Sequence, residues 1–149
     1  MVATVALLVT SLGLIPQPIM ASYGFANNCE VRGARLSESF LGMYCNNHNT
    51  AEYLYNWTWI DLNLCVSNYG GRLIPKKDGA FFRSCKPCSV KLNGSASDDH
   101  VTLNLGCNCK DVKGHTPATI LDLNTLIGND DGAMTCYDHR GNKTWIGPA

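Results

Sequence analysis

The chain has 149 residues, of which 45% are hydrophobic and 16% are charged. Twelve basic and twelve acidic side chains cancel, so no field of one sign exists to hold nucleic acid or an anionic membrane. This length is enough for one compact domain, or for two very small ones that share a core.

An apolar run opens the chain from Val2 to Ile15, and Pro16 interrupts it. The run is too short for a membrane anchor, because about twenty apolar residues are needed to cross a bilayer. A short apolar stretch that ends on a small residue, here Ala21, is typical of a secretory signal. We therefore predict a signal peptide at residues 1–21 and a secreted, extracellular mature protein.

Eight cysteines follow in the predicted mature chain: Cys29, Cys45, Cys65, Cys85, Cys88, Cys107, Cys109 and Cys136. An even number in a small exported chain indicates disulfides. In a cytosolic protein, the "CKPC" and "CNC" segments would instead suggest a zinc site, and the predicted signal argues against it. Glycosylation sequons at Asn56, Asn93 and Asn142 agree with export and suggest a glycoprotein, although such triplets also arise by chance.

The mature chain repeats an ordered set of motifs. Phe25-x-x-x-Cys29 returns as Phe81-x-x-x-Cys85, Leu41–Cys45 as Leu105–Cys109, Asp61–Asn63 as Asp122–Asn124, and Asn68-x-x-Gly71 as Asn129-x-x-Gly132. We place repeat one at about 22–74, repeat two at about 81–137 and a short C-terminal tail at 138–149. One repeat is too small to bury its own apolar faces, so the two are expected to share a core.

Each repeat predicts strands, one helical turn and a hairpin, with no long helix. Asp61 and Asp122 are expected to cap helical turns through their free N–H groups. Apolar residues at helical spacing follow each cap: Leu62, Cys65 and Val66 in one repeat, and Leu123, Leu126 and Ile127 in the other. The Asn-x-x-Gly motif that comes next is typical of a turn in which glycine supplies a positive φ.

Two further segments alternate as strands do, Tyr53–Ile60 and Val101–Leu105. The first places four aromatic side chains on one face: Tyr53, Tyr55, Trp57 and Trp59. Such a face can stack on sugar rings, but it more often packs in the core or covers the partner repeat. We therefore expect this aromatic stripe to be buried.

Two disulfides follow from the repeat, because Cys29 with Cys45 and Cys85 with Cys109 take equivalent places around predicted hairpins. Cys88 and Cys107 lie inside the second pair, where they could form a further disulfide across the same hairpin. Cys65 and Cys136 remain, either bonded to each other or as free thiols. Spacing leaves the pairing of these four open. The segment Arg72–Gly79 joins the repeats, and extension of this hinge would allow a monomer to form a strand-exchanged dimer.

The duplicated, ordered motifs resemble the cyanovirin-N family of lectins, particularly its fungal-type members, from about Ser22 to Tyr137. The resemblance implies an all-β, pseudosymmetric fold in which the two repeats exchange strands. It also implies binding of α1,2-linked mannose near the two ends of the molecule, without a metal or other cofactor.

Site residues carry over from the family by position. The first site would contain Asn27, Asn28, Asn46, Asn47, His48, Asn129, Asp130 and Asp131. A second, weaker site would contain Asn68, Arg83, Ser84, Lys110 and Asp111, with Gly70 where the family usually has Asp and Arg83 where an acidic residue is common. Asn and Asp suit sugar hydroxyls because they donate and accept on short side chains, but they also simply shape turns.

No nucleophile motif, zinc-protease motif or phosphate loop occurs in the sequence. The segment Asp98–His100 contains metal-ligand residue types, but a solvated turn is the more common explanation for such a stretch. We therefore predict a non-catalytic lectin whose partners are high-mannose glycans or glycoproteins. The alternative is a disulfide-stabilised secreted scaffold that lacks sugar binding and acts through a protein partner.

Overall fold

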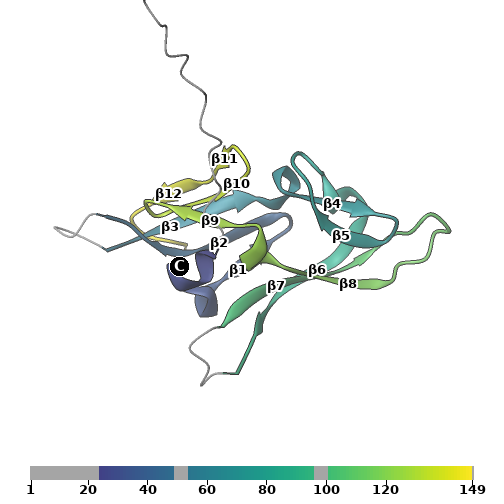
Figure 1. The fold of residues 1–149 in the computed structure, drawn as a ribbon, viewed down its shortest axis with the longest axis horizontal. Helices are drawn as coiled ribbons and strands as arrows, with labels where there is room; N and C mark the ends of the chain where they lie inside the picture. The colour runs from purple at the N-terminus through teal and green to yellow at the C-terminus, as the bar shows by residue number, and fades with distance from the viewer. Residues whose placement is uncertain (1–23, 49–53, 96–100, 149) are drawn as a thin grey trace, which may run out of the picture.

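The computed structural model describes residues 24–48, 54–95 and 101–148, and Figure 1 shows these residues as an elongated arrangement of strands. The helical segments are single 3-10 turns: η1 Phe25–Asn27, η2 Val31–Gly33, η3 Leu62–Leu64, η4 Phe81–Arg83 and η5 Leu123–Thr125. The strands are β1 Arg35–Ser37, β2 Phe40–Asn46, β3 Tyr55–Asp61, β4 Val66–Tyr69, β5 Arg72–Pro75, β6 Cys85–Asn93, β7 Thr102–Cys109, β8 Ala118–Asp122, β9 Gly128–Asp130, β10 Ala133–Cys136, β11 His139–Arg140 and β12 Asn142–Thr144. The predicted all-β class with short helical turns is confirmed.

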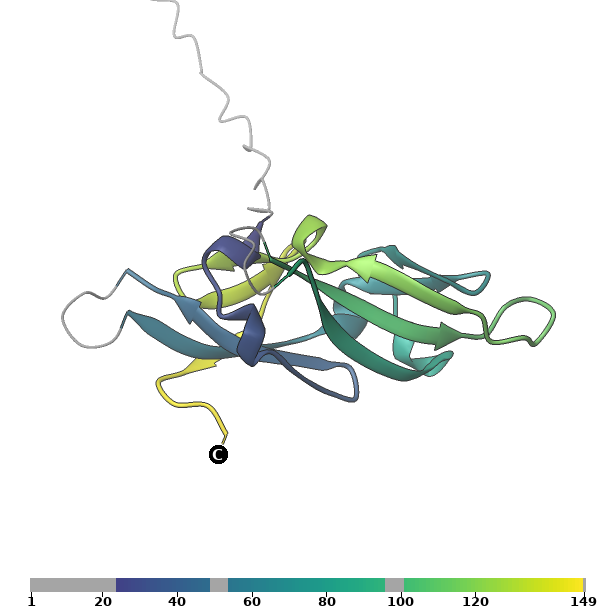
Figure 2. The same ribbon diagram turned by 90° about the horizontal axis from the view of Figure 1, so that it is seen from below.

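The strands form two halves along the long axis (Figure 1, Figure 2). One half combines the sheet β1-β2-β3-β12 with the small sheet β11-β10-β9, and the other combines the sheet β6-β7-β8 with the hairpin β4-β5. Strands β9 and β10 come from repeat two, whereas β4 and β5 come from repeat one. Each half therefore contains strands of both repeats, and the predicted strand exchange is confirmed.

Equivalent threonines attach each exchanged hairpin to its sheet. In the first half, the N–H of Met134 in β10 donates to Oγ1 of Thr58 in β3, at 3.0 Å. In the second half, the N–H of Leu73 in β5 donates to Oγ1 of Thr119 in β8, at 3.1 Å. The same side-chain acceptor thus satisfies the same backbone donor twice, which is the local basis of the pseudosymmetry.

The duplicated Asp-Leu-Asn phrase begins both equivalent 3-10 turns. Asp61 and Asp122 each accept a hydrogen bond through Oδ1 from the N–H two residues later, at 2.9 Å in both copies. The leucine that follows each cap, Leu62 or Leu123, is fully buried in the shared core. The predicted caps are confirmed, and they orient one large apolar side chain inward in each repeat.

The asparagine of the same phrase reaches the other repeat. Oδ1 of Asn63 accepts the N–H of Phe82, and Oδ1 of Asn124 accepts the N–H of Ala26, both at 3.1 Å. The phrase therefore recurs because each copy caps its own turn and also fixes the partner repeat's turn. Apolar residues from equivalent positions then meet in one core, including Phe25 with Phe81, Leu41 with Leu105, and Leu62 with Leu123.

All eight cysteines are paired, as Cys29–Cys45, Cys85–Cys109, Cys88–Cys107 and Cys65–Cys136. The first two bridges confirm the prediction from the repeat, and the last two resolve the four cysteines whose pairing spacing left open. Cys65–Cys136 joins repeat one to repeat two. The zinc alternative is wrong for this structure, because a thiol bonded to another sulfur is not a zinc ligand.

The aromatic stripe of β3 lies on the outer face of its sheet, and of its described members Trp57 is buried, Trp59 half-buried and Tyr55 exposed, so the expected burial holds only for Trp57. Thr58 and Ile60 point inward and are 0% and 2% exposed, because the exchanged hairpin packs on their face. Trp57 and Trp59 lie on the opposite, outer face, where the last residues of the chain cover Trp57. Tyr53, which we also assigned to the stripe, lies outside the described residues.

The segment Arg72–Gly79, predicted as a hinge, is partly a strand, because Arg72–Pro75 forms β5 and pairs with β4. Proline is tolerated at that position, since Pro75 is the last residue of an outer strand. Backbone N–H groups at Lys76, Asp78 and Ala80 donate to carbonyls of residues 63–65. The connection between the repeats is therefore shorter than predicted and is tied to the first repeat.

The segment predicted as a tail also contributes strands. Strand β11 pairs with β10, and β12 pairs with the edge of β3 in the register Asn142↔Trp59 and Thr144↔Trp57. These strands bring charged residues beside the β9–β10 turn.

Candidate functional site at the Asn129 turn

The turn between β9 and β10 runs from Asn129 to Gly132 and is closed by its own first side chain. Oδ1 of Asn129 accepts the N–H of Gly132 at 3.0 Å. Asp131 and Gly132 both have positive φ, 48° and 80°. Glycine adopts this conformation freely and aspartate tolerates it, so the sequence Asn-Asp-Asp-Gly suits this backbone.

Three segments that are distant in sequence meet at this Asn129 turn. Nδ2 of Asn129 donates to the carbonyl of Asn46 at 2.8 Å, and Oδ1 of Asp131 accepts the N–H of His48 at 2.8 Å. The N–H of Asn46 in turn donates to the carbonyl of Asn28 at 2.7 Å. The structure therefore brings together the three segments in which we expected the first site.

Two cations flank the turn. Arg140 donates to Oδ2 and to the carbonyl of Asp130, at 3.0 and 2.8 Å. Nζ of Lys143 donates to the carbonyl of Asp131 at 2.6 Å and lies 3.4 Å from its Oδ2. The N–H of His48, followed by Lys143, lowers the pKa of the Asp131 carboxyl below its ordinary value, so Asp131 is ionised at neutral pH.

Asn47 differs from the other members of the predicted set, because it points into the protein. It is only 4% exposed, and its Nδ2 donates to Oδ1 of Asn56 at 2.6 Å. A Cβ added at Gly132 would lie 2.9 Å from Cβ of Asn47. In this conformation Asn47 forms the floor of the turn and does not present its amide to solvent.

A small hollow of about 90 Å³ lies beside the turn, with Asn27, Asn28, Cys29, Glu30, Asn46 and Tyr55 around it. This volume holds a few water molecules, so a sugar would rest across the rim and would not be enclosed. Asn27, Asn28, Asn46 and His48 are exposed around this region, whereas Asn129 and Asp131 are half-buried. The side chains available to a ligand are thus mostly amides.

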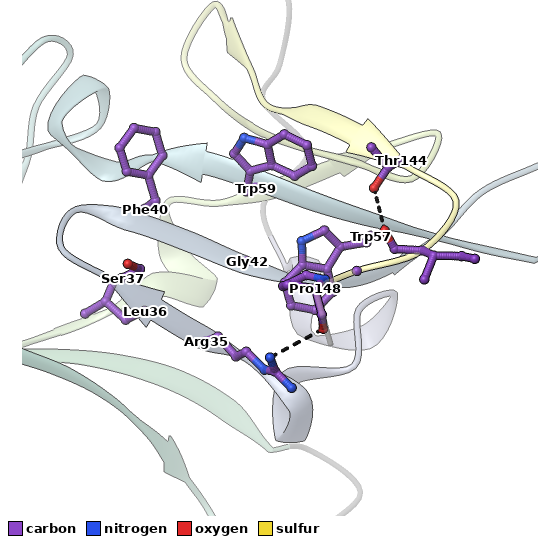
Figure 3. Close-up of a pocket in the computed structure, with 11 residues that line it drawn as sticks. Arg35, Leu36, Ser37, Phe40, Gly42, Trp57, Trp59, Thr144 and Pro148 are labelled. Atoms are coloured by element: carbon purple, nitrogen blue, oxygen red, sulfur yellow. Dashed lines mark hydrogen bonds between the residues drawn. The ribbon is translucent and has the colours of Figure 1, made fainter.

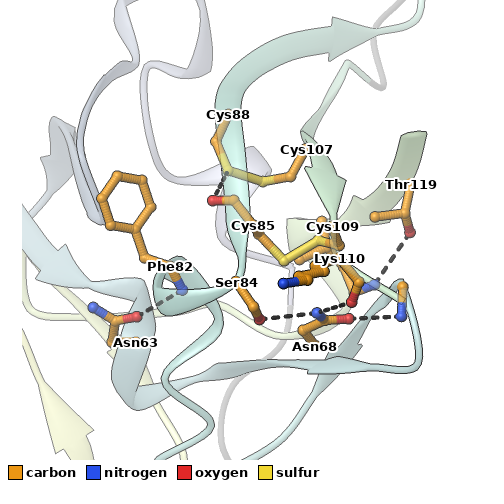
Figure 4. Close-up of a disulfide and its surroundings, with 12 residues drawn as sticks. Asn63, Asn68, Phe82, Ser84, Cys85, Cys88, Cys107, Cys109, Lys110 and Thr119 are labelled. Atoms are coloured by element: carbon orange, nitrogen blue, oxygen red, sulfur yellow. Dashed lines mark hydrogen bonds between the residues drawn. A yellow bond between two sulfur atoms is a disulfide. The ribbon is translucent and has the colours of Figure 1, made fainter. Parts of the chain in front are cut away.

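In the equivalent turn of repeat one, Asn68 to Gly71, both side-chain amide hydrogens of Asn68 are donated to other groups of the protein (Figure 4). Nδ2 of Asn68 donates to Oγ of Ser84 at 2.9 Å and to the carbonyl of Lys110 at 2.8 Å. Oδ1 of the same residue accepts the N–H of Gly71 at 2.9 Å. This Asn68 turn repeats the backbone geometry of the Asn129 turn but keeps no free amide hydrogen on that side chain.

The loop after β7 lies against the Asn68 turn. Oδ1 of Asp111 accepts the N–H groups of Lys113 and His115, both at 2.8 Å, so it closes its own loop. Desolvation acts to raise the pKa of Asp111, but these two N–H groups and the His115 ring outweigh it and lower the pKa. A Cβ at Gly71 would lie 3.0 Å from both Asp111 and Pro117. The predicted residues Arg83 and Lys110 are exposed.

The family model described as "CVNH domain" matches residues 25–135, most of the chain. The protein belongs to the CVNH family. This match confirms the resemblance to the cyanovirin-N lectins. A separate search of curated proteins gave no match.

Solved CVNH structures share this fold at low sequence identity. The NMR structure of GzCVNH from Gibberella zeae is 18% identical, with a TM-score of 0.63 over 76% of this chain and 97% of that chain. A crystal structure of a MoCVNH3 variant in complex with (N-GlcNAc)4 is 16% identical, with a TM-score of 0.58 over 77% and 99%. A microvirin:mannobiose complex is 20% identical, with a TM-score of 0.57 over 76% and 98%.

Sequence reasoning did not select four residues that lie around the Asn129 turn and the small hollow: Glu30, Tyr55, Arg140 and Lys143. Arg140 and Lys143 belong to β11 and β12, beyond the second repeat, so no motif duplication pointed to them. Glu30 and Tyr55 lie within repeat one, next to residues that we did select.

Within the described ranges, no group of three or more His, Cys, Asp or Glu side chains is arranged to hold a metal ion. Asp98–His100, considered as a metal segment, lies outside those ranges. Among the same residues, no helix is both long and apolar enough to cross a membrane.

Proposed function

We propose that this CVNH protein is a non-catalytic lectin that binds glycans ending in α1,2-linked mannose at the Asn129 turn. The observation that carries the proposal is the convergence of three segments there, through Asn129 to Asn46, His48 to Asp131 and Asn46 to Asn28. These contacts fix the side chains of Asn129 and Asp131 and hold the backbone of the other two segments beside them. Rigid donors and acceptors lose little entropy when a sugar hydroxyl binds.

The unused hydrogen-bonding groups of the turn fit a sugar. Asn129 uses one of its two amide hydrogens in the turn and keeps the other. The exposed amides of Asn27, Asn28 and Asn46 add further donors and acceptors for sugar hydroxyls. Asp131 supports the frame while ionised, and its second oxygen is only loosely contacted, at 3.4 Å by Lys143.

The Asn68 turn is the weaker candidate in this proposal. Both hydrogens of its asparagine are used inside the protein, and Gly70 carries no carboxylate where Asp131 stands in the other repeat. Arg83, Ser84, Lys110 and Asp111 would form any second site. We propose that its mannose affinity is low or absent.

Two of the structural neighbours were solved with sugars, microvirin with mannobiose and the MoCVNH3 variant with (N-GlcNAc)4. These proteins are less than 25% identical to this chain, so they support carbohydrate binding as a class and leave the sugar as our proposal. The four disulfides are compatible with an extracellular protein. We propose that residues 1–21 are a signal peptide and that the mature chain from about residue 22 is a secreted monomer.

One observation favours a different function, recognition of a protein partner. Open, mainly apolar grooves of about 720 and 530 Å³ lie on the outer faces of the two main sheets, away from both turns. Exposed apolar surface of this kind is common where proteins bind other proteins. A lectin needs neither groove at its sugar site.

A glycan array tests the proposal. We expect wild-type protein to bind glycans with terminal α1,2-linked mannose, and we expect Asn129→Ala with Asp131→Ala to weaken that binding by roughly one to two decades. The matched control is Asn68→Ala with Lys110→Ala, which should keep most of the signal. Because the first pair also removes turn contacts, Asp131→Asn, which retains an acceptor for His48, serves as a folded intermediate case. No glycan binding by the wild type would favour the protein-partner function.

A further inference from the structure

The larger outer groove lies on the face of the first sheet that points away from the core. Figure 3 shows Phe40 and Trp59 standing on one side of it and Trp57 under the end of the chain. We refer to this groove, whose base is the paired strands β2 and β3, as the Trp59 groove. Gly42 lies opposite Trp59 in the strand pairing, and the Trp57 ring lies over it, because a Cβ at Gly42 would be only 2.7 Å from Cζ2 of Trp57.

The second half of the molecule contains the equivalent groove, and it is not aromatic. By the alignment of the repeats, Ala118 and Ile120 stand where the first half has Trp57 and Trp59. The same fold is therefore built with small or aliphatic residues at these positions. Trp57 packs edge-on against the Tyr44 ring and beneath Gly147, whereas Trp59 stays half-buried beside the groove.

The end of the chain covers only part of the Trp59 groove. The N–H of Gly147 donates to the hydroxyl of Tyr44 at 2.9 Å, and a Cβ at Gly147 would lie 2.5 Å from the Trp57 ring. Trp57 is consequently only 7% exposed, whereas Phe40 remains 45% exposed. Trp59 is half-buried and lies beyond the part that the tail covers.

The asparagines of the three glycosylation sequons differ in their exposure to solvent. Asn56 is 4% exposed, and its amide both accepts from Asn47 and donates to the carbonyl of Thr144, so the folded protein has no room for a sugar on it. Asn93 and Asn142 are both exposed. Only these two are compatible with an N-linked glycan in this fold.

The two exposed sequons differ in their cross-strand neighbours. Asn142 in β12 pairs with Trp59, so the two side chains project from the same face of the sheet, with Cβ atoms about 5 Å apart. Asn93 at the end of β6 pairs with Thr102 and has no aromatic partner across the strand. A sugar on Asn142 would therefore start at the rim of the Trp59 groove, whereas a sugar on Asn93 would project from a polar hairpin.

We propose that Asn142 carries an N-linked glycan whose first N-acetylglucosamine packs its C–H face on the indole of Trp59. The axial C–H bonds of the sugar carry partial positive charge, which the negative face of the indole attracts, and their contact removes apolar surface from water. This modification explains why the aromatic residues and the strand that carries the sequon occur together in one half. It rests on the export proposed above.

The covalent step requires a polyprenyl-diphosphate oligosaccharide and the transferase of the secretory pathway. Nδ2 of Asn142 attacks C1 of the first N-acetylglucosamine, forming the C1–Nδ2 bond while the bond from C1 to the diphosphate oxygen breaks. The polyprenyl diphosphate leaves with that electron pair, and one amide proton passes to a base. The glycan then shields the open part of the groove, which makes this groove unavailable to a protein partner.

The test uses the full chain expressed in a eukaryotic secretory host and glycopeptide mass spectrometry of the three sequons. We expect a glycan on Asn142 and none on Asn56. An endoglycosidase that leaves one N-acetylglucosamine then gives the form for NMR, in which the Trp59 indole N–H resonance should be shifted relative to Asn142→Gln. The matched control, Asn93→Gln, should leave that resonance where it is in the trimmed wild type.

Two results would overturn the proposal: an unmodified Asn142, or a Trp59 resonance that is the same in the trimmed wild type and in Asn142→Gln. Trp59→Val should keep the glycan on Asn142 but abolish any difference in protection of β12 amides from exchange between glycosylated and unglycosylated protein. Sugar binding at the Asn129 turn is measured separately on Asn142→Gln. Its loss or retention judges the lectin proposal and leaves the glycan proposal untouched.

Discussion

Replacing Gly132 with alanine perturbs the Asn129 turn at its most crowded point. The new Cβ would lie 2.8 Å from Oδ1 of Asn56 and 2.9 Å from Cβ of Asn47, and both of these neighbours are buried. The residue would also have to adopt a φ of 80°. The left-handed backbone costs an L-residue roughly 1–2 kcal/mol, and overpacking costs about 1–3 kcal/mol.

These costs together predict that Gly132→Ala lowers the free energy of unfolding by about 3 kcal/mol, which corresponds to a fall in Tm of roughly 10 °C. Gly70→Ala is the control, because its φ is also positive, at 58°, but a Cβ there meets nothing within 4 Å. It should cost only about 1 kcal/mol, from the backbone alone. Urea unfolding of both variants measures the difference. Equal losses would refute the idea that the Asn47–Asn56 floor constrains the turn.

Three further predictions concern the frame around this turn. Thr58→Val leaves the buried N–H of β10 without its acceptor, so urea unfolding should show a loss of about 1–3 kcal/mol, and an unchanged midpoint would contradict the strand-exchange contact. Because the pKa of Asp131 is lowered, its bond to the His48 N–H is complete above the ordinary aspartate range and is lost only as pH falls through the lower folded value; the carboxyl carbon shift of Asp131 should therefore titrate with a midpoint below that of an ordinary aspartate, and a midpoint at or above it would contradict this. Changing Cys65 and Cys136 together to serine should cost about 2–4 kcal/mol and increase the dimer seen by light scattering, since that bridge joins the two repeats; a more stable variant or an unchanged monomer would contradict it.

The parts of the fold that could be predicted from the sequence are those written twice. Asp61 and Asp122 cap their turns by local chemistry that does not depend on the rest of the chain, so the motif alone predicts the element. The symmetric disulfides follow for the same reason, because equivalent positions take equivalent partners. Cys65 pairs with Cys136 without a symmetric counterpart, so the repeat could not predict that bridge.

Features that depend on tertiary contacts were not predictable from one sequence. Strands β11 and β12 are too short to show alternation, and they form because the edges of β10 and β3 are free to pair. Those strands supply Arg140 and Lys143 to the Asn129 turn. The direction of Asn47 depends on a buried acceptor nine residues away, and no local pattern separates an inward asparagine from an outward one.

An NMR titration of isotope-labelled protein with α1,2-mannobiose tests the central proposal most directly. We predict chemical-shift changes centred on Asn129, Asp131 and the amides of Asn46 and His48, with little change at the Asn68 turn. In Asn129→Ala with Asp131→Ala, folded by circular dichroism, those changes should disappear. Shifts confined to the Asn68 turn would reverse the ranking of the two turns, and no shifts anywhere in the wild type would contradict mannose recognition by this protein.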